Sequence, residues 1–453
     1  MILMASLALL LGCGKQPGQE RQVEEGRPLE LSSRDISLVT ARMTDVMVHD
    51  VTNPPLAARF FAYACLAGYE VVAQHDSAYA SMHGRLNGYP QMEKPAPEEG
   101  YSYQLAAVLA MLETAQKMQP SGSSLLEEYE QGLLDSLRRE GVAEQVIAGS
   151  LAYARQVSGQ VLAYAKADRY NRISNYPRYT PRQGEGQWYP TPPGFFAPVE
   201  PYFSTVRPFT LDTCVQFKPE PPVSFSSEKK SPFYRLMHQT YEEGAGLDPE
   251  KRAIAAFWDC NPFALQESGH LLVGLKKISP GAHWMGITGI ACEQAKVSFN
   301  EAMKINTLVS VSLMDGFVAC WDEKFRSNRV RPETAIRRHI HPGWRPLLQT
   351  PPFPEYLSGH SVISSAAATV LTHCLGEGFA YTDTVEERYG LPARSFSSFQ
   401  EAAVEAGLSR LYGGIHFMDA IDQGRLQGLQ VGEWVLQKLE GKDAPAKVVA
   451  KVK

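Results

Sequence analysis

Seven residues in the C-terminal half of the sequence have the types and spacing needed to bind a tetrahedral oxyanion and act on it. Three are cations: arginine offers planar, forked donors, and lysine offers a point charge. A Ser-Gly pair before a helix offers a hydroxyl and backbone N–H groups, and glycine lets the backbone approach the anion closely. Of two histidines, one can bond the central atom while the other moves protons. These residues are Lys324, Arg331, Ser358, Gly359, His360, Arg410 and His416.

The seven residues fall in three short motifs, over 324–332, 354–360 and 409–416. Each motif is weak evidence when it is taken alone. A lysine and an arginine seven positions apart usually form a solvated helix end, and Ser-Gly-His is often only a helix cap. Because the motifs occur together, in one order and with one set of spacings, they favour a functional anion site over unrelated structural features.

The elements that must position these residues are predicted to be helices. Upstream of the motifs, apolar side chains recur at three-to-four spacing over 60–72, 103–118, 124–139 and 142–164. Around the motifs, helical patterns return over 249–258, 293–323, 361–375, 399–411 and 417–439. Strand signals are few. We therefore predict an all-α fold of packed helical bundles with one long Pro-rich excursion.

The excursion lies between the two helical regions and is crowded with proline and aromatic residues over 170–232. Proline removes a backbone donor and clashes with the preceding turn, so this segment is not regular helix. It is predicted either to wrap the helical body or to act as a lid. The chain then divides into a signal segment (1–13), a polar tether (14–35), an N-terminal helical region (36–169), the excursion (170–248) and a C-terminal helical region (249–442). The last three form one composite domain.

The N-terminus indicates export. A short apolar run ends in Leu-Leu-Gly followed by Cys13, which resembles a bacterial lipobox, whereas the alternative is a plain secretory signal with a chance cysteine. The run is too short to span a bilayer. The sequence therefore predicts a periplasmic protein, an outer-membrane lipoprotein or an extracellular protein, attached to a membrane only through a lipid on Cys13.

Composition and the remaining cysteines exclude other classes. The net charge of -5 gives no basic field for nucleic acid, and 44% hydrophobic residues support a sizeable core. Six widely scattered cysteines are compatible with disulfides or with buried free thiols, and no CxxC or Cys/His cluster has the spacing of a zinc motif. They are Cys65, Cys214, Cys260, Cys292, Cys320 and Cys374.

The three motifs resemble much of the Lys-x6-Arg-Pro, Pro-Ser-Gly-His and Ser-Arg-x5-His-x3-Asp signature of vanadium haloperoxidases and type 2 phosphatidic acid phosphatases, most strongly over 255–435. The resemblance implies that His416 coordinates vanadium and that His360 is the acid–base group for peroxide. It implies that the remaining five residues hold the vanadate oxygens, namely Lys324, Arg331, Arg410, Ser358 and the N–H of Gly359.

Two departures from that signature are visible. Leu357 replaces the proline before Ser-Gly-His, and the aspartate of the third motif is displaced, because Ala420 is flanked by Asp419 and Asp422. Whether either aspartate orients His416 or faces solvent stays open at this point. Neither departure removes a group that would contact the anion.

Several features favour the haloperoxidase branch. The chain is long and lacks membrane helices, and Trp321 and Phe353 match aromatic positions of fungal chloroperoxidases. Segments 258–263 and 276–284 look like those of exported bacterial iodoperoxidases. Trp321, Phe353 and Phe263 are candidates for a polarisable halide wall, although a single aromatic near a site is usually core. Phe263 has no hydroxyl to donate.

The resemblance thus implies a vanadate cofactor and hydrogen peroxide and a halide as substrates. Iodide is favoured because it is easiest to oxidise, bromide is possible, and the hypohalous product would halogenate organic substrates. The first alternative is an acid phosphatase of the same fold that uses His416 as nucleophile. The second is a non-catalytic surface lipoprotein, in which His360 would have no role.

Overall fold

The computed structural model describes residues 29–441 except 97–99, 193, 269–270 and 275–276. The predicted signal segment, with Cys13, and most of the tether lie outside the described residues. The first helix begins at Ser33, inside the stretch predicted as tether, because Ser32 forms a capping box with Asp35.

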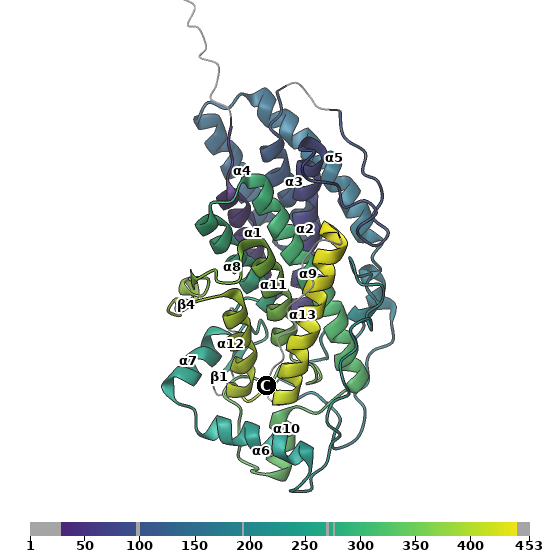
Figure 1. Cartoon of the computed structure of the whole chain (residues 1–453), viewed down its shortest axis with the longest axis vertical. Coiled ribbons are helices and arrows are strands. Elements are labelled where there is room, and N and C mark those ends of the chain that lie inside the picture. Colours follow the sequence, from purple (N-terminus) through teal and green to yellow (C-terminus); the bar gives the residue numbers. More distant parts are fainter. Residues whose placement is uncertain (1–28, 97–99, 193, 269–270, 275–276, 442–453) are drawn as a thin grey trace, which may run out of the picture.

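Helices dominate the described residues, which confirms the predicted all-α class (Figure 1). The N-terminal group comprises α1 (Ser33–His49), α2 (Pro54–His75), α3 (Tyr103–Met118), α4 (Ser123–Arg139) and α5 (Glu144–Lys166). The C-terminal group comprises α8 (Pro280–Ala295), α9 (Phe299–Ser327), α11 (Gly359–Leu375), α12 (Phe399–Tyr412) and α13 (Met418–Glu440). Helix α9 packs against both α2 and α11, so it joins the groups through one continuous core.

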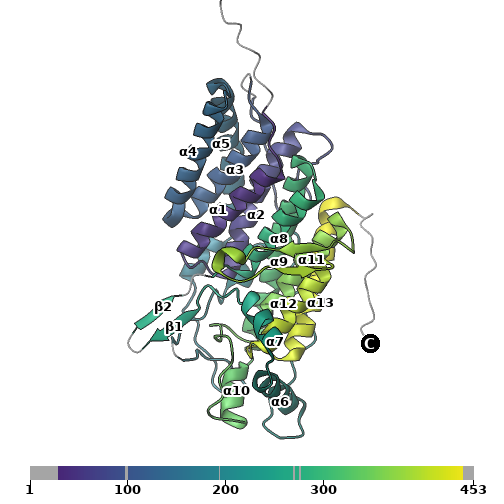
Figure 2. The same cartoon turned by 90° about the vertical axis from the view of Figure 1, so that its left-hand side faces the viewer.

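Smaller elements lie around these groups. They are α6 (Pro232–Ala245), α7 (Pro249–Phe257), α10 (Pro332–His339), the 3-10 turns η1 (Pro120–Gly122), η2 (Tyr170–Asn175), η3 (Phe203–Thr205) and η4 (Glu387–Tyr389), and four short strands. Strands β1 (Leu265–Ser268) and β2 (Leu271–Gly274) form one antiparallel pair, which projects from the body in Figure 2. Strands β3 (Tyr381–Asp383) and β4 (Arg394–Phe396) form the other.

Two helices, α2 and α9, are long and apolar enough to cross a membrane by length and composition. In the structure, 89% and 94% of their most apolar windows are buried inside the protein. They are therefore the central helices of the core, which explains why their sequences lack a polar face.

The structure corrects two expectations about helices. The helix predicted over 293–323 is two helices, because Lys296 adopts a left-handed conformation (φ 52°) and Ser298 then caps α9. Helix α6 lies inside the segment 170–248 that was predicted as excursion. Ser231 caps it and Pro232 occupies its first position, a favourable helix start hidden by the proline-rich sequence before it.

The excursion wraps the helical body instead of standing free as a lid. Its backbone N–H groups at Trp188 and Val199 donate to the carbonyls of Asn328 (2.8 Å) and Pro352 (3.1 Å). Farther along, the N–H of Phe209 donates at 2.6 Å to the buried Asp315 carboxylate of α9. Its aromatic side chains at 188, 203 and 209 are buried, so apolar contact also fixes the segment.

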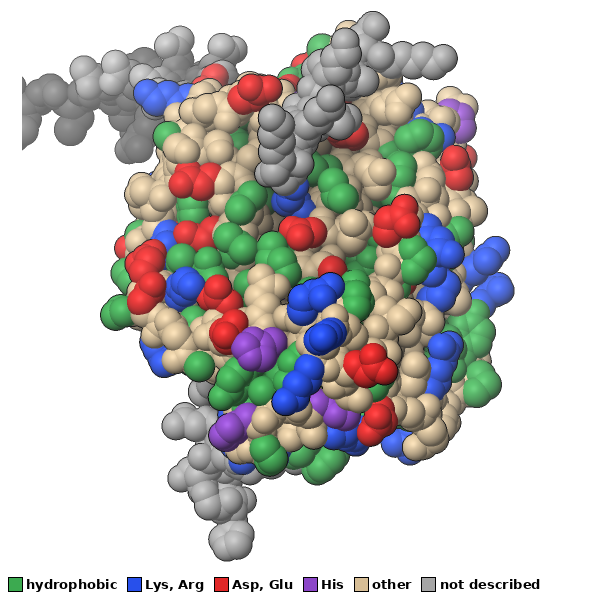
Figure 3. Space-filling model, turned by 60° about the horizontal axis from the view of Figure 1, so that its bottom comes forward, with side chains coloured by type: hydrophobic (Ala, Val, Ile, Leu, Met, Phe, Trp, Pro, Cys, Tyr) green, Lys and Arg blue, Asp and Glu red, His purple; other side chains and the backbone are tan. Residues whose placement is uncertain are grey.

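The surface and the cysteines agree with the composition. Figure 3 shows basic, acidic and apolar side chains interspersed over the lower end of the molecule, without a broad field of one sign. All six cysteines within the described residues are free thiols, and four of them are buried. The thiol alternative therefore holds over the disulfide alternative.

Candidate active site

The ends of five helices bring the three sequence motifs together at one end of the C-terminal group. A helix N-terminus presents unpaired backbone N–H groups, which suit an anion, and basic side chains in the last turns of other helices can reach the same space. Lys324 lies in the last turn of α9, Arg331 immediately precedes α10, Ser358 caps α11, Gly359 and His360 begin α11, Arg410 lies in the last turn of α12, and His416 precedes α13.

Three cations in this cluster are buried without an anionic partner. Lys324, Arg331 and Arg410 are 0%, 0% and 1% exposed, and among the described residues none has a carboxylate within ion-pair distance. Burial lowers the pKa of Lys324 to about 7 and that of Arg331 to about 9, and it also lowers the pKa of Arg410. Uncompensated buried charge is costly, so the cluster is stabilised by any anion that enters it.

His416 is held as a neutral imidazole with one defined nitrogen available. Its Nδ1 lies 2.9 Å from Oε1 of Glu355, and because a carboxylate only accepts, Nδ1 carries the proton. Its Nε2 accepts from Nη1 of Arg331 at 3.1 Å. Burial, and then the charge of Arg331 and of Lys324, lower the pKa of His416 well below its usual value. A neutral imidazole with an oriented lone pair is the form that binds a metal.

Glu355 is the supporting residue that the sequence analysis missed. It is fully buried, accepts a second hydrogen bond from the N–H of Phe417 at 2.9 Å, and pairs with Arg329. The only available signal was an acidic residue just before Ser-Gly-His, within the second motif. The sequence pattern offers Asp419 and Asp422, which follow His416 in the chain, as candidates to orient its ring.

Neither of those aspartates contacts His416. Asp419 accepts from the guanidinium of Arg329 at 2.6 and 2.8 Å, and Arg329 in turn pairs with Glu355. Asp422 is exposed. Asp419 therefore acts on His416 only through two intervening side chains.

His360 faces a small cavity of about 40 Å³ together with Gly359, Arg410 and His416. That volume holds roughly three water-sized groups, the scale of a small oxyanion. Burial, and then the charges of Arg410 and His416, lower the pKa of His360 well below its usual value. Lys324, Arg331 and Ser358 lie behind this lining: Arg331 contacts His416, and Lys324 donates to the carbonyls of Pro354 and Glu355 at 3.1 and 3.2 Å.

Two buried polar atoms of the cluster have no hydrogen-bond partner: Nε2 of His360 and Nη2 of Arg331. Orphaned polar atoms in a folded core require an explanation, and a ligand is one. With the three cations that lack a carboxylate partner and with Nε2 of His416, which accepts from Arg331, they fit an oxyanion such as vanadate. The donor set is wholly positive or neutral, as an anion requires.

The three predicted aromatic residues line the same small cavity. Trp321 and Phe353 lie with ring centres 5.0 Å apart, and the Lys324 ammonium lies 5.1 Å from the Phe353 ring centre. Nε1 of Trp321 donates to the carbonyl of Val199 at 3.1 Å, so the excursion fixes this wall. The cavity thus combines a cationic side with an apolar, polarisable side.

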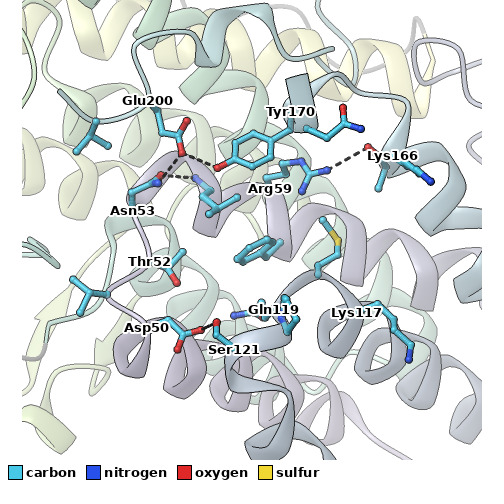
Figure 4. Close-up of a pocket in the computed structure, with 18 of the residues that line it drawn as sticks. Asp50, Thr52, Asn53, Arg59, Lys117, Gln119, Ser121, Lys166, Tyr170 and Glu200 are labelled. Atoms are coloured by element: carbon cyan, nitrogen blue, oxygen red, sulfur yellow. Dashed lines mark hydrogen bonds between the residues drawn. The ribbon is translucent and has the colours of Figure 1, made fainter. Parts of the chain in front are cut away.

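Phe263 also lines a second, much larger cavity of about 740 Å³. Figure 4 shows its polar rim, where Glu200 accepts from Asn53 (2.8 Å) and from Tyr170 (2.7 Å), with Arg59 beside them. Because Phe263 belongs to both linings, the large cavity adjoins the small one.

Comparison with known proteins decides the family. Residues 304–442 match the family model described as the VCPO second helical-bundle domain. The crystal structure of the first bacterial vanadium-dependent iodoperoxidase aligns with a TM-score of 0.86 and 40% identity over 92% of this chain and 98% of that chain. The chain belongs to the vanadium-dependent haloperoxidases.

More distant structures share the haloperoxidase fold. A holo-type bacterial vanadium-dependent chloroperoxidase aligns with a TM-score of 0.63 and 15% identity, over 90% of this chain and 93% of that chain. The apo-type structure gives 0.63 and 14%, over 88% and 95%. No curated protein matches the chain. The family resemblance inferred from the three motifs is confirmed, and the phosphatase alternative is not favoured.

Proposed function

We propose that this haloperoxidase oxidises halides with hydrogen peroxide at a protein-bound vanadate, with iodide preferred and bromide second. The observation that carries this proposal is the trio of buried cations without a carboxylate partner beside Nε2 of His416, which accepts from one of them, Arg331. In the overall reaction, halide, hydrogen peroxide and one proton give hypohalous acid and water. The hypohalous acid then halogenates organic acceptors.

In this proposal His416 would hold vanadium through Nε2, the nitrogen to which Arg331 donates in this structure. Glu355 keeps the ring in the required tautomer. Arg331 then donates to vanadate oxygens, as do Lys324 and Arg410. The Ser358 hydroxyl and the N–H of Gly359 complete the set at the start of α11. Bound vanadate supplies a Lewis acid that stays in its highest oxidation state while peroxide oxidises the halide.

His360 moves the proton in this proposal. Its depressed pKa leaves the imidazole neutral near pH 7, so its unpartnered Nε2 can take a proton from incoming hydrogen peroxide. The same nitrogen returns the proton to the oxygen that leaves as water. A protein that merely bound an anion would not need a neutral histidine with an unpartnered Nε2 beside three cations.

The halide would rest against Trp321, Phe353 and Phe263. A large, soft iodide loses less hydration free energy in an apolar pocket than a smaller halide does, and it is also the easiest to oxidise. Both effects favour iodide over bromide. The adjoining large cavity would admit peroxide and halide and release the product.

A vanadate titration tests the proposal against the phosphatase alternative. Apo-protein should oxidise iodide only after vanadate is added, and the His416→Ala protein should stay inactive at the same vanadate concentration. Hydrolysis of p-nitrophenyl phosphate by the apo-protein, inhibited by vanadate, would instead identify a phosphatase. Tight vanadate binding without either activity would favour the non-catalytic alternative.

We also propose that the chain is exported and carries a lipid on Cys13. The support is the apolar run ending in Leu-Leu-Gly before that cysteine. Metabolic labelling with a radioactive fatty acid should mark the protein, and Cys13→Ser should remove both the label and the protein from the membrane fraction. An unlabelled full-length chain in the cytoplasm would contradict this proposal.

A further inference from the structure

A second cluster of metal-binding residue types adjoins the small cavity that His360 and His416 line, called the vanadate cavity below. It consists of Cys260, which follows α7, His283 in the first turn of α8, and Glu386, which precedes η4. The three are 2%, 0% and 7% exposed. They lie 23 and 126 residues apart along the chain, counted from Cys260, so no local spacing could reveal them.

Two of the three distances within this cluster match the edges of a tetrahedral metal site, and the third, between sulfur and oxygen, is longer. Nδ1 of His283 lies 3.4 Å from Sγ of Cys260 and 3.4 Å from Oε1 of Glu386, and the sulfur and that oxygen are 3.9 Å apart. An N–H···O hydrogen bond spans about 2.7–3.2 Å, so the His–Glu contact is too long for one. Ordinary zinc–ligand bonds in a tetrahedron separate S, N and O ligands by about 3.3–3.6 Å.

His283 is supported in the way that metal-binding histidines are. Its other nitrogen, Nε2, lies 2.8 Å from Oδ2 of the fully buried Asp383, which therefore takes the proton-bearing side of the ring. Nδ1 faces Cys260 and Glu386, and a metal ion bound there would displace any proton that this nitrogen carries. A carboxylate on the far nitrogen fixes the tautomer and increases the basicity of the ligating one. Trp258 stacks on the ring at 4.7 Å and holds its plane.

The buried charges of the cluster also call for a cation. Two carboxylates, those of Asp383 and Glu386, and the Cys260 thiol surround the imidazole of His283, and all of these side chains are buried. Among the described residues, no lysine or arginine pairs with Glu386: Lys277 pairs with Asp259, and Arg410 donates to the Trp258 carbonyl at 2.5 Å. A divalent ion would balance a thiolate and a carboxylate at this position.

We propose that Cys260, His283 and Glu386 bind one divalent ion of the zinc type. A thiolate with an imidazole selects zinc over calcium or magnesium, which prefer oxygen ligands. The three protein ligands leave the fourth tetrahedral position to water. The ion would tie the end of α7 and the 384–387 segment to α8. Because Cys260 also lines the vanadate cavity, this cross-link would brace one wall of that cavity.

Metal analysis of the tag-free protein, grown in zinc-supplemented medium and purified without chelator, tests the proposal. The wild type should retain about one zinc per chain, because a buried thiolate–imidazole site binds zinc tightly. Cys260→Ala and Glu386→Gln should each lose most of it. Cys292→Ala, which removes another buried thiol outside the cluster, is the matched control and should keep it. Vanadium is measured in the same samples, so this result is separate from the proposed peroxidase activity.

Cobalt substitution gives a second readout that does not depend on activity. The Co²⁺-loaded wild type should show near-ultraviolet thiolate-to-metal absorption. If Cys260→Ala does not fold, Glu386→Gln, which keeps the shape of the side chain, still tests the site. The Cys260→Ala protein, where folded, should lack this band. Zinc-free wild type after supplementation and dialysis against zinc, or variants that retain full zinc, would overturn the proposal.

Discussion

Glu355 offers a sharp test of how the protein prepares His416. Glu355→Gln removes the carboxylate that accepts from Nδ1 of His416 and from Arg329, while preserving the size of the side chain. The amide can present either its oxygen or its NH₂ to the ring, so the tautomer with a free Nε2 is no longer enforced. Vanadate affinity should therefore fall although every vanadate-contacting residue is intact.

The expected magnitude follows from the contacts. Loss of a partner that orients a metal-bound histidine typically weakens metal affinity about 10–100-fold, or about 1.4–2.7 kcal/mol. Asp419→Asn is the matched control, because it removes a carboxylate from the same Arg329 guanidinium without touching His416. Both variants should also lose about 1.5–3 kcal/mol of folding stability from a weakened charge-assisted contact.

The assay is a vanadate titration of each apo-protein, followed by recovered iodide oxidation, with urea unfolding of the vanadate-free proteins alongside. Affinity should fall for Glu355→Gln and stay near the parent value for Asp419→Asn, while both lose stability. Equal affinity losses would mean that the charge around Arg329 matters and the hydrogen bond to His416 does not. Parent-like affinity in Glu355→Gln would refute the reasoning outright.

Three further outcomes are expected. His416→Ala should abolish vanadium retention, measured by elemental analysis, while leaving the helical circular dichroism nearly unchanged. His360→Ala should keep vanadium but slow peroxide-dependent turnover roughly 10²–10⁴-fold, and more for bromide than for iodide; parent-like turnover at normal vanadium content would remove His360 from the mechanism. Burial lowers the pKa of Lys324 from 10.5 to about 7 in the folded chain. Between these two pH values the Lys324 amine is therefore more protonated in the unfolded chain than in the folded chain. The stability of the vanadate-free protein should therefore rise with pH from about 7 to 10 relative to Lys324→Met, and identical pH profiles in urea unfolding would contradict this.

The sequence predicted that the motif residues come together, and the structure brings them together at five helix ends, because each motif is local. Ser358, Gly359 and His360 are consecutive and begin a helix, so backbone geometry alone places them together. The aromatic candidates Trp321 and Phe353 lie a few residues from motif positions, and both line the cavity. In such cases chain proximity becomes spatial proximity.

Contacts between distant segments were beyond the sequence. The partner of His416 was sought among the aspartates that follow it, whereas Glu355 reaches it from a segment 61 residues away. The Cys260–His283–Glu386 cluster likewise depends on how α7, α8 and the β3–β4 hairpin meet. The break at Lys296 was missed for a different reason, since a single left-handed residue hardly disturbs the apolar pattern of α8 and α9.

The two backbone hydrogen bonds of Val199 have a consequence for how such an enzyme can diversify. Its N–H donates to Pro352 and its carbonyl accepts from Trp321, so one residue of the excursion anchors both flanks of the aromatic wall. The motif residues that are proposed to hold vanadate lie outside the excursion, at the ends of α9, α10, α11, α12 and α13. Surface-running segments accept substitution and insertion more readily than packed helices. Exchange of the excursion around Val199 between relatives would therefore change the aromatic wall, and with it the proposed halide selectivity. The motif residues that are proposed to hold vanadate would stay the same.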